Sequence, residues 1–257
     1  LQWISESSWP YRSLQPHSAT DPALYPPTVL VDQPLAYLRF SDPLIRTNVF
    51  ANIGSLGFPG NAINSGARPF SGAFPGSSGN SQFFNGASWA QIPWNALINP
   101  PNTQPFTIEA WLYPTSDQIN GGQAVLMNRY SYPGVNRQGW ILFQRAPNNS
   151  YAGKPGYEGV GWNFRMYRGS GSSAGLDVTS GVPYQIGTWN HVVVVYDPVD
   201  GVRPTLTMYV NGIAAATTTW TGDGPGYVAN TADHPASEAP DGPAGLALGA
   251  YNNTSPG

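Results

Sequence analysis

Short apolar runs separated by turn residues recur along most of this chain. Runs rich in Val, Ile, Thr and aromatic residues, bounded by Gly, Pro, Asn or Asp, are typical of β-strands. No sustained helical periodicity accompanies them, and such a pattern indicates a sandwich or a barrel. The predicted strands cover residues 36–40, 81–84, 89–92, 106–113, 123–129, 139–144, 162–167, 189–196, 206–210, 213–220 and 245–251.

Two of these predictions carry additional signals. Residues 189–196 are almost continuously β-branched, which is expected of a strand with both faces covered. Residues 206–210 alternate and end in Asn211-Gly212, a favoured hairpin turn, so residues 213–220 are the expected return strand.

The first part of the chain has a different character. Residues 1–33 are predicted to be a Pro-rich linker or arm, because their prolines, including Pro26 and Pro27, break regular elements. Residues 52–82 are predicted to be a long loop rich in Gly, Asn, Ser and Pro, interrupted by a short strand near Ala62 and Ile63. Residues 34–257 then form the sandwich.

Composition narrows the function classes. The chain has 257 residues, a net charge of −3 and only 10% charged residues, without a basic stripe, so a nucleic-acid partner is not expected. No apolar run is long enough to cross a bilayer, so no membrane insertion is expected. The chain has no cysteine, which excludes disulfides and thiolate metal sites. A surface of uncharged polar residues is typical of extracellular proteins.

Several segments, in order, resemble laminin-G-like domains of the concanavalin A-like lectin/glucanase superfamily. Residues 105–114 (PFTIEAWLYP), 187–197 (GTWNHVVVVYD), 206–212 (LTMYVNG) and 246–251 (LALGAY) match its strands, and residues 84–86 (FNG) stand where the family has "FDG". The resemblance implies an all-β, jelly-roll-like sandwich of two antiparallel sheets. It also implies extracellular adhesion, glycan recognition or scaffolding.

The chain departs from the family at its calcium loop. Residues 48–57 replace an acidic loop and contain no carboxylate, and the Asp of "FDG" is Asn85. Calcium prefers several oxygen ligands, including charged ones. No cofactor is therefore expected, and calcium stays open as an alternative although the usual acidic loop is absent.

A second departure concerns the last strand that the family has after its "L-IGA" segment. Here the sandwich is predicted to lack that strand, which would leave residues 36–40 as an unpaired edge. Two hypotheses remain open. Either the chain is a fragment of a larger surface protein, or another copy donates the strand.

Enzyme chemistry finds little support in the sequence. Residues 171–175 (GSSAG) fit a nucleophile pattern around Ser173, but no helix follows, as that pattern requires. A glycosidase of this fold needs two nearby carboxylates, whereas Glu109 and Glu158 stand alone. Glu109 is predicted to be a hydrogen-bonded structural acid and His191 a packed histidine. The chain is therefore predicted not to be an enzyme.

Sugar binding uses aromatic faces together with amide and arginine side chains. Strand alternation places Trp162, Phe164 and Met166 on one face and the more polar Asn163, Arg165 and Tyr167 on the other. The predicted glycan-binding residues are Trp140, Asn163, Arg165 and Tyr167.

The sequence thus predicts a non-catalytic extracellular module for adhesion that binds a glycan or a protein partner. The alternative is a structural subunit of an extracellular assembly or filament, completed by strand exchange between copies. A glycoside hydrolase of the same fold is a remote alternative.

Overall fold

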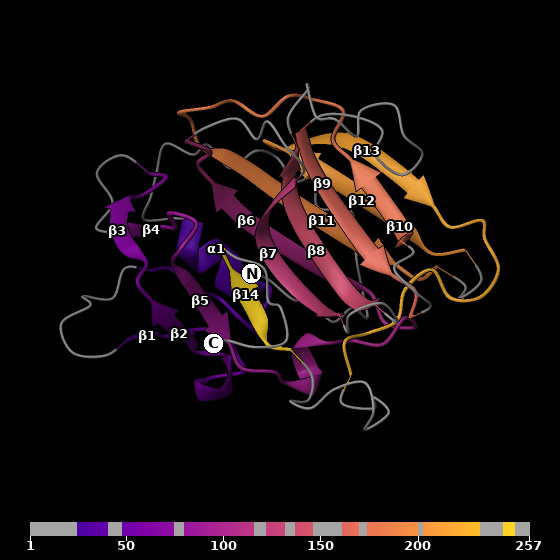
Figure 1. Ribbon diagram of the computed structural model, residues 1–257, viewed down its shortest axis with the longest axis horizontal. Helices are drawn as coiled ribbons and strands as arrows, with labels where there is room; N and C mark the ends of the chain where they lie inside the picture. Colours follow the sequence, from indigo (N-terminus) through magenta and orange to yellow (C-terminus); the bar gives the residue numbers. More distant parts are fainter. Residues whose placement is uncertain are drawn as a thin grey trace.

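Two antiparallel β-sheets face each other across one hydrophobic core (Figure 1). The structure is a computed structural model that describes residues 25–40, 48–74, 80–115, 122–131, 137–145, 161–169, 174–199, 203–231 and 244–249. The arrangement confirms the predicted all-β sandwich.

The larger sheet contains eight strands of the described chain. They are β1 (Val49–Phe50), β2 (Ala62–Ser65), β5 (Trp89–Ile92), β14 (Leu246–Leu248), β7 (Gly122–Ser131), β8 (Arg137–Arg145), β9 (Gly161–Tyr167) and β10 (Ala174–Thr179), in that spatial order. β14 therefore lies between two strands that come much earlier in the sequence.

The smaller sheet has the order β13–β12–β11–β6. Its strands are β6 (Phe106–Leu112), β11 (Asn190–Asp197), β12 (Thr205–Val210) and β13 (Ile213–Thr219). The predicted hairpin at Asn211-Gly212 is confirmed, and Asn211 adopts the left-handed φ of 52° that such a turn requires. A separate hairpin joins β3 (Arg68–Ser71) to β4 (Asn80–Phe83).

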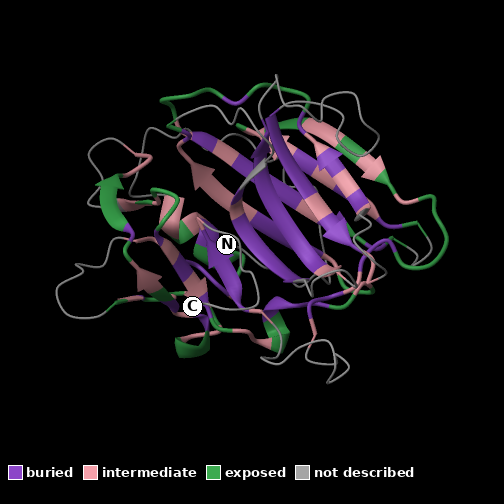
Figure 2. Cartoon of the chain, in the orientation of Figure 1, coloured by how far each residue is buried: buried purple, intermediate pink, exposed green. Residues whose placement is uncertain are grey.

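The core lies between the inner faces of the two sheets (Figure 2). Strand alternation supplies it: Val192, Val194 and Tyr196 of β11 are all buried, as are Trp162 and Phe164 of β9. Each such side chain contributes about 1.5–3 kcal/mol of transfer free energy when it is fully buried.

Several elements differ from the predictions. Residues 36–40 are not a strand, because Leu38 makes a single bridge to Asn52 and no ladder follows. Strand β10 was not predicted. A helix, α1 (Tyr25–Val31), occupies part of the predicted arm. Pro26 and Pro27 fit its first turn, where backbone N–H groups have no partner within the helix.

Two short 3₁₀ helices complete the described elements. They are η1 (Phe58–Gly60) and η2 (Ala96–Ile98), and the Asn95 side chain caps the second by accepting from the N–H of Leu97.

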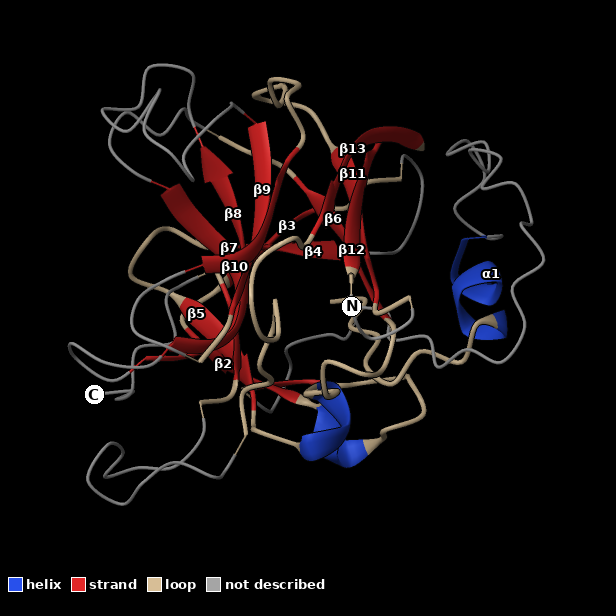
Figure 3. Ribbon diagram, turned by 90° about the vertical axis from the view of Figure 1, so that its right-hand side faces the viewer, coloured by secondary structure: helices blue, strands red, loops and turns tan. Residues whose placement is uncertain are grey.

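Helix α1 packs on the outer face of the smaller sheet (Figure 3). Its Tyr25 hydroxyl donates to Oε1 of Glu109 on β6, and Nε2 of His191 on β11 lies 2.8 Å from the same oxygen. The Tyr25 ring also contacts Phe74 and Trp111, and Trp111 stacks on His191 at 4.6 Å. Glu109 is hydrogen-bonded, as the sequence predicted.

Acid is expected to loosen this helix from the sheet. Burial alone raises the pKa of Glu109, but the hydrogen bond and charge of His191 and the hydrogen bond of Tyr25 outweigh it and lower the pKa below its usual range. The folded protein therefore binds this proton more weakly than the unfolded chain does. The resulting stability is present above the unfolded pKa of about 4.5 and is lost as pH falls through the folded value.

Urea unfolding at pH 6 and at pH 3 measures this dependence. We expect Glu109→Gln to show a smaller loss of stability on acidification than the wild type. Asp197→Asn, at an exposed position at the end of β11, is the control and should keep the wild-type dependence. An unchanged pH dependence in Glu109→Gln would contradict the assignment.

Candidate functional site

Four neighbouring strands of the larger sheet, β7 to β10, turn a second set of side chains away from the core. We call this side of the sheet the arginine face, and many of its side chains are buried. It carries a small apolar cluster that includes Ile141 and Phe143, separate from the main core. Its polar and aromatic members are Arg129, Arg137, Phe143, Arg145, Asn163, Arg165, Tyr167, Asp177 and Thr179.

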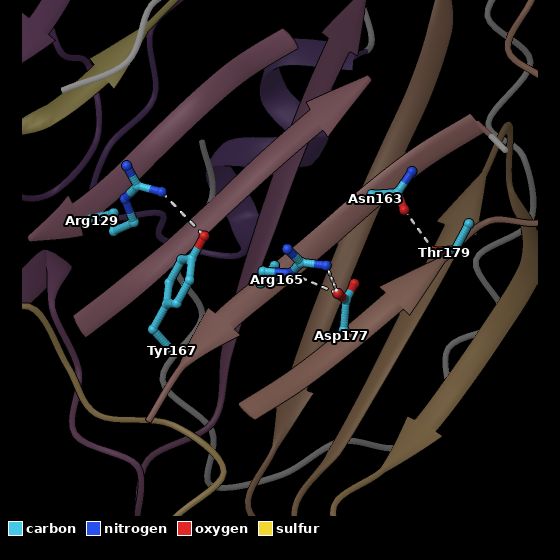
Figure 4. A network of polar contacts seen from close by, with 6 residues as sticks. All are labelled: Arg129, Asn163, Arg165, Tyr167, Asp177 and Thr179. Atoms are coloured by element: carbon cyan, nitrogen blue, oxygen red, sulfur yellow. Dashed lines mark hydrogen bonds and ion pairs between the residues drawn. The ribbon is translucent and has the colours of Figure 1, made fainter. Parts of the chain in front are cut away.

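Cross-strand pairs join these side chains (Figure 4). Arg165 lies directly opposite Asp177 in the sheet and donates from Nε to Oδ2 at 2.7 Å. In the next cross-strand pair on the same face, Thr179 donates to Oδ1 of Asn163, also at 2.7 Å. The register of β9 against β10 therefore sets both contacts.

Arginines also pack on the two aromatic rings of this face. The guanidinium carbons of Arg129 and Arg137 lie 5.4 and 5.8 Å from the centre of the Tyr167 ring. Nη1 of Arg129 donates to the Tyr167 hydroxyl at 3.2 Å. Such contacts hold the cations in place through the negative face of the ring.

Phe143 has the same arrangement. Arg145 lies 4.9 Å and Arg165 5.7 Å from its ring centre. Four arginines thus gather around two rings, and Asp177 is the carboxylate that the described residues place among them.

Burial strengthens the electrostatic effect of this cluster. Arg129 is 8% exposed and Arg145 is 3% exposed, whereas the Arg165 and Asp177 side chains keep 11% and 20% of their surfaces. Charges shielded from water act more strongly on a ligand than exposed ones do. In addition, Nε of Arg129 is buried and has no hydrogen-bond partner. The arrangement is suited to a negatively charged group.

The predicted site residues meet in part. Alternation correctly placed Asn163, Arg165 and Tyr167 on one face, although Asn163 and Tyr167 are buried. The prediction for Trp140 is wrong. It lies on the inner face of β8, fully buried, and its ring stacks on Phe164 at 5.3 Å.

Sequence reasoning missed Arg129, Arg137, Arg145 and Asp177. The spacing of the arginines in β8 could have indicated two of them. Arg137 and Arg145 lie an even number of positions apart along the strand, so their side chains share a face. Asp177 had no such signal, since β10 was not recognised as a strand.

The segments that stand where the family has its calcium ligands use side-chain amides in contacts with the backbone. Oδ1 of Asn52 accepts the N–H groups of Tyr37 and Gly54, and its amide nitrogen donates to the carbonyls of Leu35 and Gly57. Oδ1 of Asn85 accepts the N–H of Ala87. These oxygens serve the backbone, and among the described residues no group of three or more His, Asp or Glu side chains converges.

Two other candidates lie outside the described residues. They are Ser173 of the nucleophile pattern and Glu158. No helix within the described ranges is long and apolar enough to cross a membrane.

Comparison with known proteins identifies a family and shows a likeness among solved structures. The family model Laminin_G_3, described as "Concanavalin A-like lectin/glucanases superfamily", matches residues 84–237. None of the curated proteins matches the chain. Among solved structures, the chain is similar to domain 4 of AbnA, an extracellular GH43 arabinanase from Geobacillus stearothermophilus, in complex with arabinotriose. That likeness has 15% identity and a TM-score of 0.43, and it covers 72% of this chain and 67% of the other.

Proposed function

Because this chain belongs to the concanavalin A-like lectin/glucanases superfamily, we propose that it is a non-catalytic extracellular module whose arginine face binds an acidic glycan. The observation that carries the proposal is the gathering of Arg129, Arg137, Arg145 and Arg165 around Tyr167 and Phe143. The ligand class is a glycan with carboxylate or sulfate groups.

The chemistry of the face supports this ligand class. Arginine presents a planar fork of N–H donors that matches the two oxygens of a carboxylate or sulfate. Arg137 and Arg165 are partly open and would contact the ligand directly, whereas Arg129 and Arg145 lie deeper and add to the positive potential. The partly exposed Thr179 adds a hydroxyl beside them, which the buried Asn163 orients by accepting its hydrogen bond.

The proposal that the module is non-catalytic rests on the contact between Asp177 and Arg165. Glycoside hydrolysis uses a pair of carboxylates, one as acid and the other as base or nucleophile. Here Nε and Nη2 of Arg165 both bind Oδ2 of Asp177. That contact suits a fixed counter-charge that orients Arg165 better than it suits proton transfer.

Isothermal titration with two trisaccharides tests the proposal. We expect the trimer of galacturonate to bind and the neutral trimer of galactose to bind at least about tenfold more weakly. Arg165→Met should lower the affinity for the acidic trimer by about tenfold, because it removes a charged hydrogen bond to the ligand. Arg203→Met, at an exposed position before β12, is the matched control and should bind like the wild type.

Two results would contradict the proposal. One is equal affinity for the acidic and neutral trimers. The other is an equal effect of the two arginine substitutions. Circular dichroism of each variant verifies that the sandwich is folded before affinities are compared.

A further inference from the structure

Alternate residues of β9 place the polar groups of the arginine face in three successive rows (Figure 4). Tyr167, Arg165 and Asn163 follow one another along this face, each about 7 Å from the next, because a strand rises about 3.4 Å per residue. The register of the sheet extends the rows across the neighbouring strands. We call them the Tyr167 row (Tyr167, Arg129 and Arg137), the Arg165 row (Arg165 and Asp177) and the Asn163 row (Asn163 and Thr179).

The Tyr167 row gathers two positive charges on one ring. The guanidinium carbons of Arg129 and Arg137 lie 5.4 and 5.8 Å from the ring centre. Arg129 is 8% exposed, whereas Arg137 is partly open, so a ligand can reach Arg137 while Arg129 adds charge from a more buried position. A carboxylate or sulfate group is favoured in this row, because both guanidinium groups attract it.

The Arg165 row carries its own counter-charge. Nε and Nη2 of Arg165 both donate to Oδ2 of Asp177, so the two charges of the pair cancel. Arg165 can still donate to an anion that is held in the neighbouring Tyr167 row. A second anionic group over the Arg165 row, however, would meet the Asp177 carboxylate, whose side chain keeps 20% of its surface, and like charges repel.

The Asn163 row presents a hydroxyl oxygen as an acceptor. The partly exposed Thr179 hydroxyl donates its hydrogen to Oδ1 of Asn163 at 2.7 Å, which leaves its oxygen to accept. A sugar hydroxyl can donate to that oxygen, but a carboxylate or sulfate ion has no hydrogen to donate. Arg145 packs on Phe143, opposite Asn163 in the sheet, but it is only 3% exposed. This row therefore favours a neutral sugar.

We infer that the arginine face recognises its glycan with a fixed polarity, with an acidic sugar at the Tyr167 row and a neutral sugar at the Asn163 row. The inference rests on the proposed function and narrows its ligand class. The preferred ligand is a heteroglycan that carries acidic and neutral sugars in one chain, rather than a chain of acidic sugars alone. Arg137 and Thr179 determine specificity at the two ends of the site.

Isothermal titration with trisaccharides of equal length tests this polarity. The all-acid trimer has galacturonate at every position, and the end-acid and central-acid trimers have a single galacturonate, at one end or in the centre, with galactose elsewhere. We expect the end-acid trimer to bind at least as tightly as the all-acid trimer, although it carries less charge. The central-acid trimer should bind about tenfold more weakly, because its acidic group cannot occupy the Tyr167 row while neutral sugars cover both other rows.

Protein variants assign the two ends of the site. Arg137→Met should lower the affinity for the end-acid trimer by about tenfold and leave that for the galactose trimer unchanged, because it removes a contact to the acidic group. Thr179→Val should lower both affinities by the same factor, because both trimers place a neutral sugar there. Asp177→Asn should raise the affinity for the all-acid trimer relative to the end-acid trimer, because it removes a like charge. Arg203→Met is again the exposed control.

The ligand series separates failure of the polarity from failure of glycan binding. If the all-acid trimer binds most tightly and affinity falls with each acidic group removed, glycan binding stands and the fixed polarity is overturned. Equal affinities for the end-acid and central-acid trimers, or an equal effect of Arg137→Met on the end-acid and galactose trimers, would also overturn it. If no acidic trimer binds more tightly than the galactose trimer, the proposed function itself fails, and the polarity fails with it.

Discussion

Replacing Trp140 by alanine is expected to lower the free energy of unfolding by about 3–5 kcal/mol. Trp140 is fully buried on the inner face of β8, where it stacks on Phe164 and belongs to the main core. Removing the indole loses its transfer free energy and leaves a cavity that the surrounding strands cannot fully close. Urea unfolding followed by far-ultraviolet circular dichroism measures the change.

Trp189→Ala provides the comparison for this prediction. Trp189 precedes β11, is partly exposed and contacts Tyr113 edge-on at 5.4 Å. Its removal should cost less than half as much. If Trp140 were a ligand-binding residue on an open face, Trp140→Ala would fold with near wild-type stability, and that result would contradict the structure.

Replacing Gly139 by alanine is expected to cost at least about 3 kcal/mol, because backbone geometry leaves no room for a side chain. Gly139 has a φ of +83°, and a Cβ atom there would lie 1.9 Å from the carbonyl oxygen of Asn128. Its N–H also donates to the carbonyl of Val228, which ties β8 to a distant segment. Accommodation would require β7 and β8 to move apart.

Gly224→Ala separates the steric cost of an added Cβ atom from the cost of the positive φ. Gly224 also has a positive φ, of +70°, but a methyl group at that position would meet nothing within 4 Å. Its substitution should cost only about 1 kcal/mol, the penalty for the left-handed backbone conformation. Thermal unfolding of the two variants compares them directly, and equal losses would contradict a steric role for Asn128.

Local pattern predicted much of the fold. β5 was predicted at residues 89–92, and the β12–β13 hairpin followed from alternation and its Asn211-Gly212 turn. β10 escaped prediction because its alternating part, residues 176–179, is short and follows Gly175. The strand predicted at residues 36–40 was wrong for a different reason. These residues alternate, but a strand also needs a paired neighbour, and Leu38 makes only one bridge.

The candidate site was less accessible to sequence reasoning. Alternation within β9 correctly put Asn163, Arg165 and Tyr167 on one face, because that relation is local. The approach of Arg129 to Tyr167 depends on the order of β7, β8 and β9 in the sheet, which no local pattern encodes. The contact between Tyr25 and Glu109 joins residues 84 positions apart in the sequence, so no local pattern could predict it either.

Binding of an acidic glycan on the arginine face is best tested at the arginines themselves. The protein is titrated with the galacturonate trimer, and the nuclear magnetic resonance signals of the arginine Nε–H groups are followed. We expect the signals of Arg129, Arg137, Arg145 and Arg165 to shift together, while those of Arg68 and Arg203 stay in place. Shifts confined to arginines outside the arginine face would contradict glycan binding there.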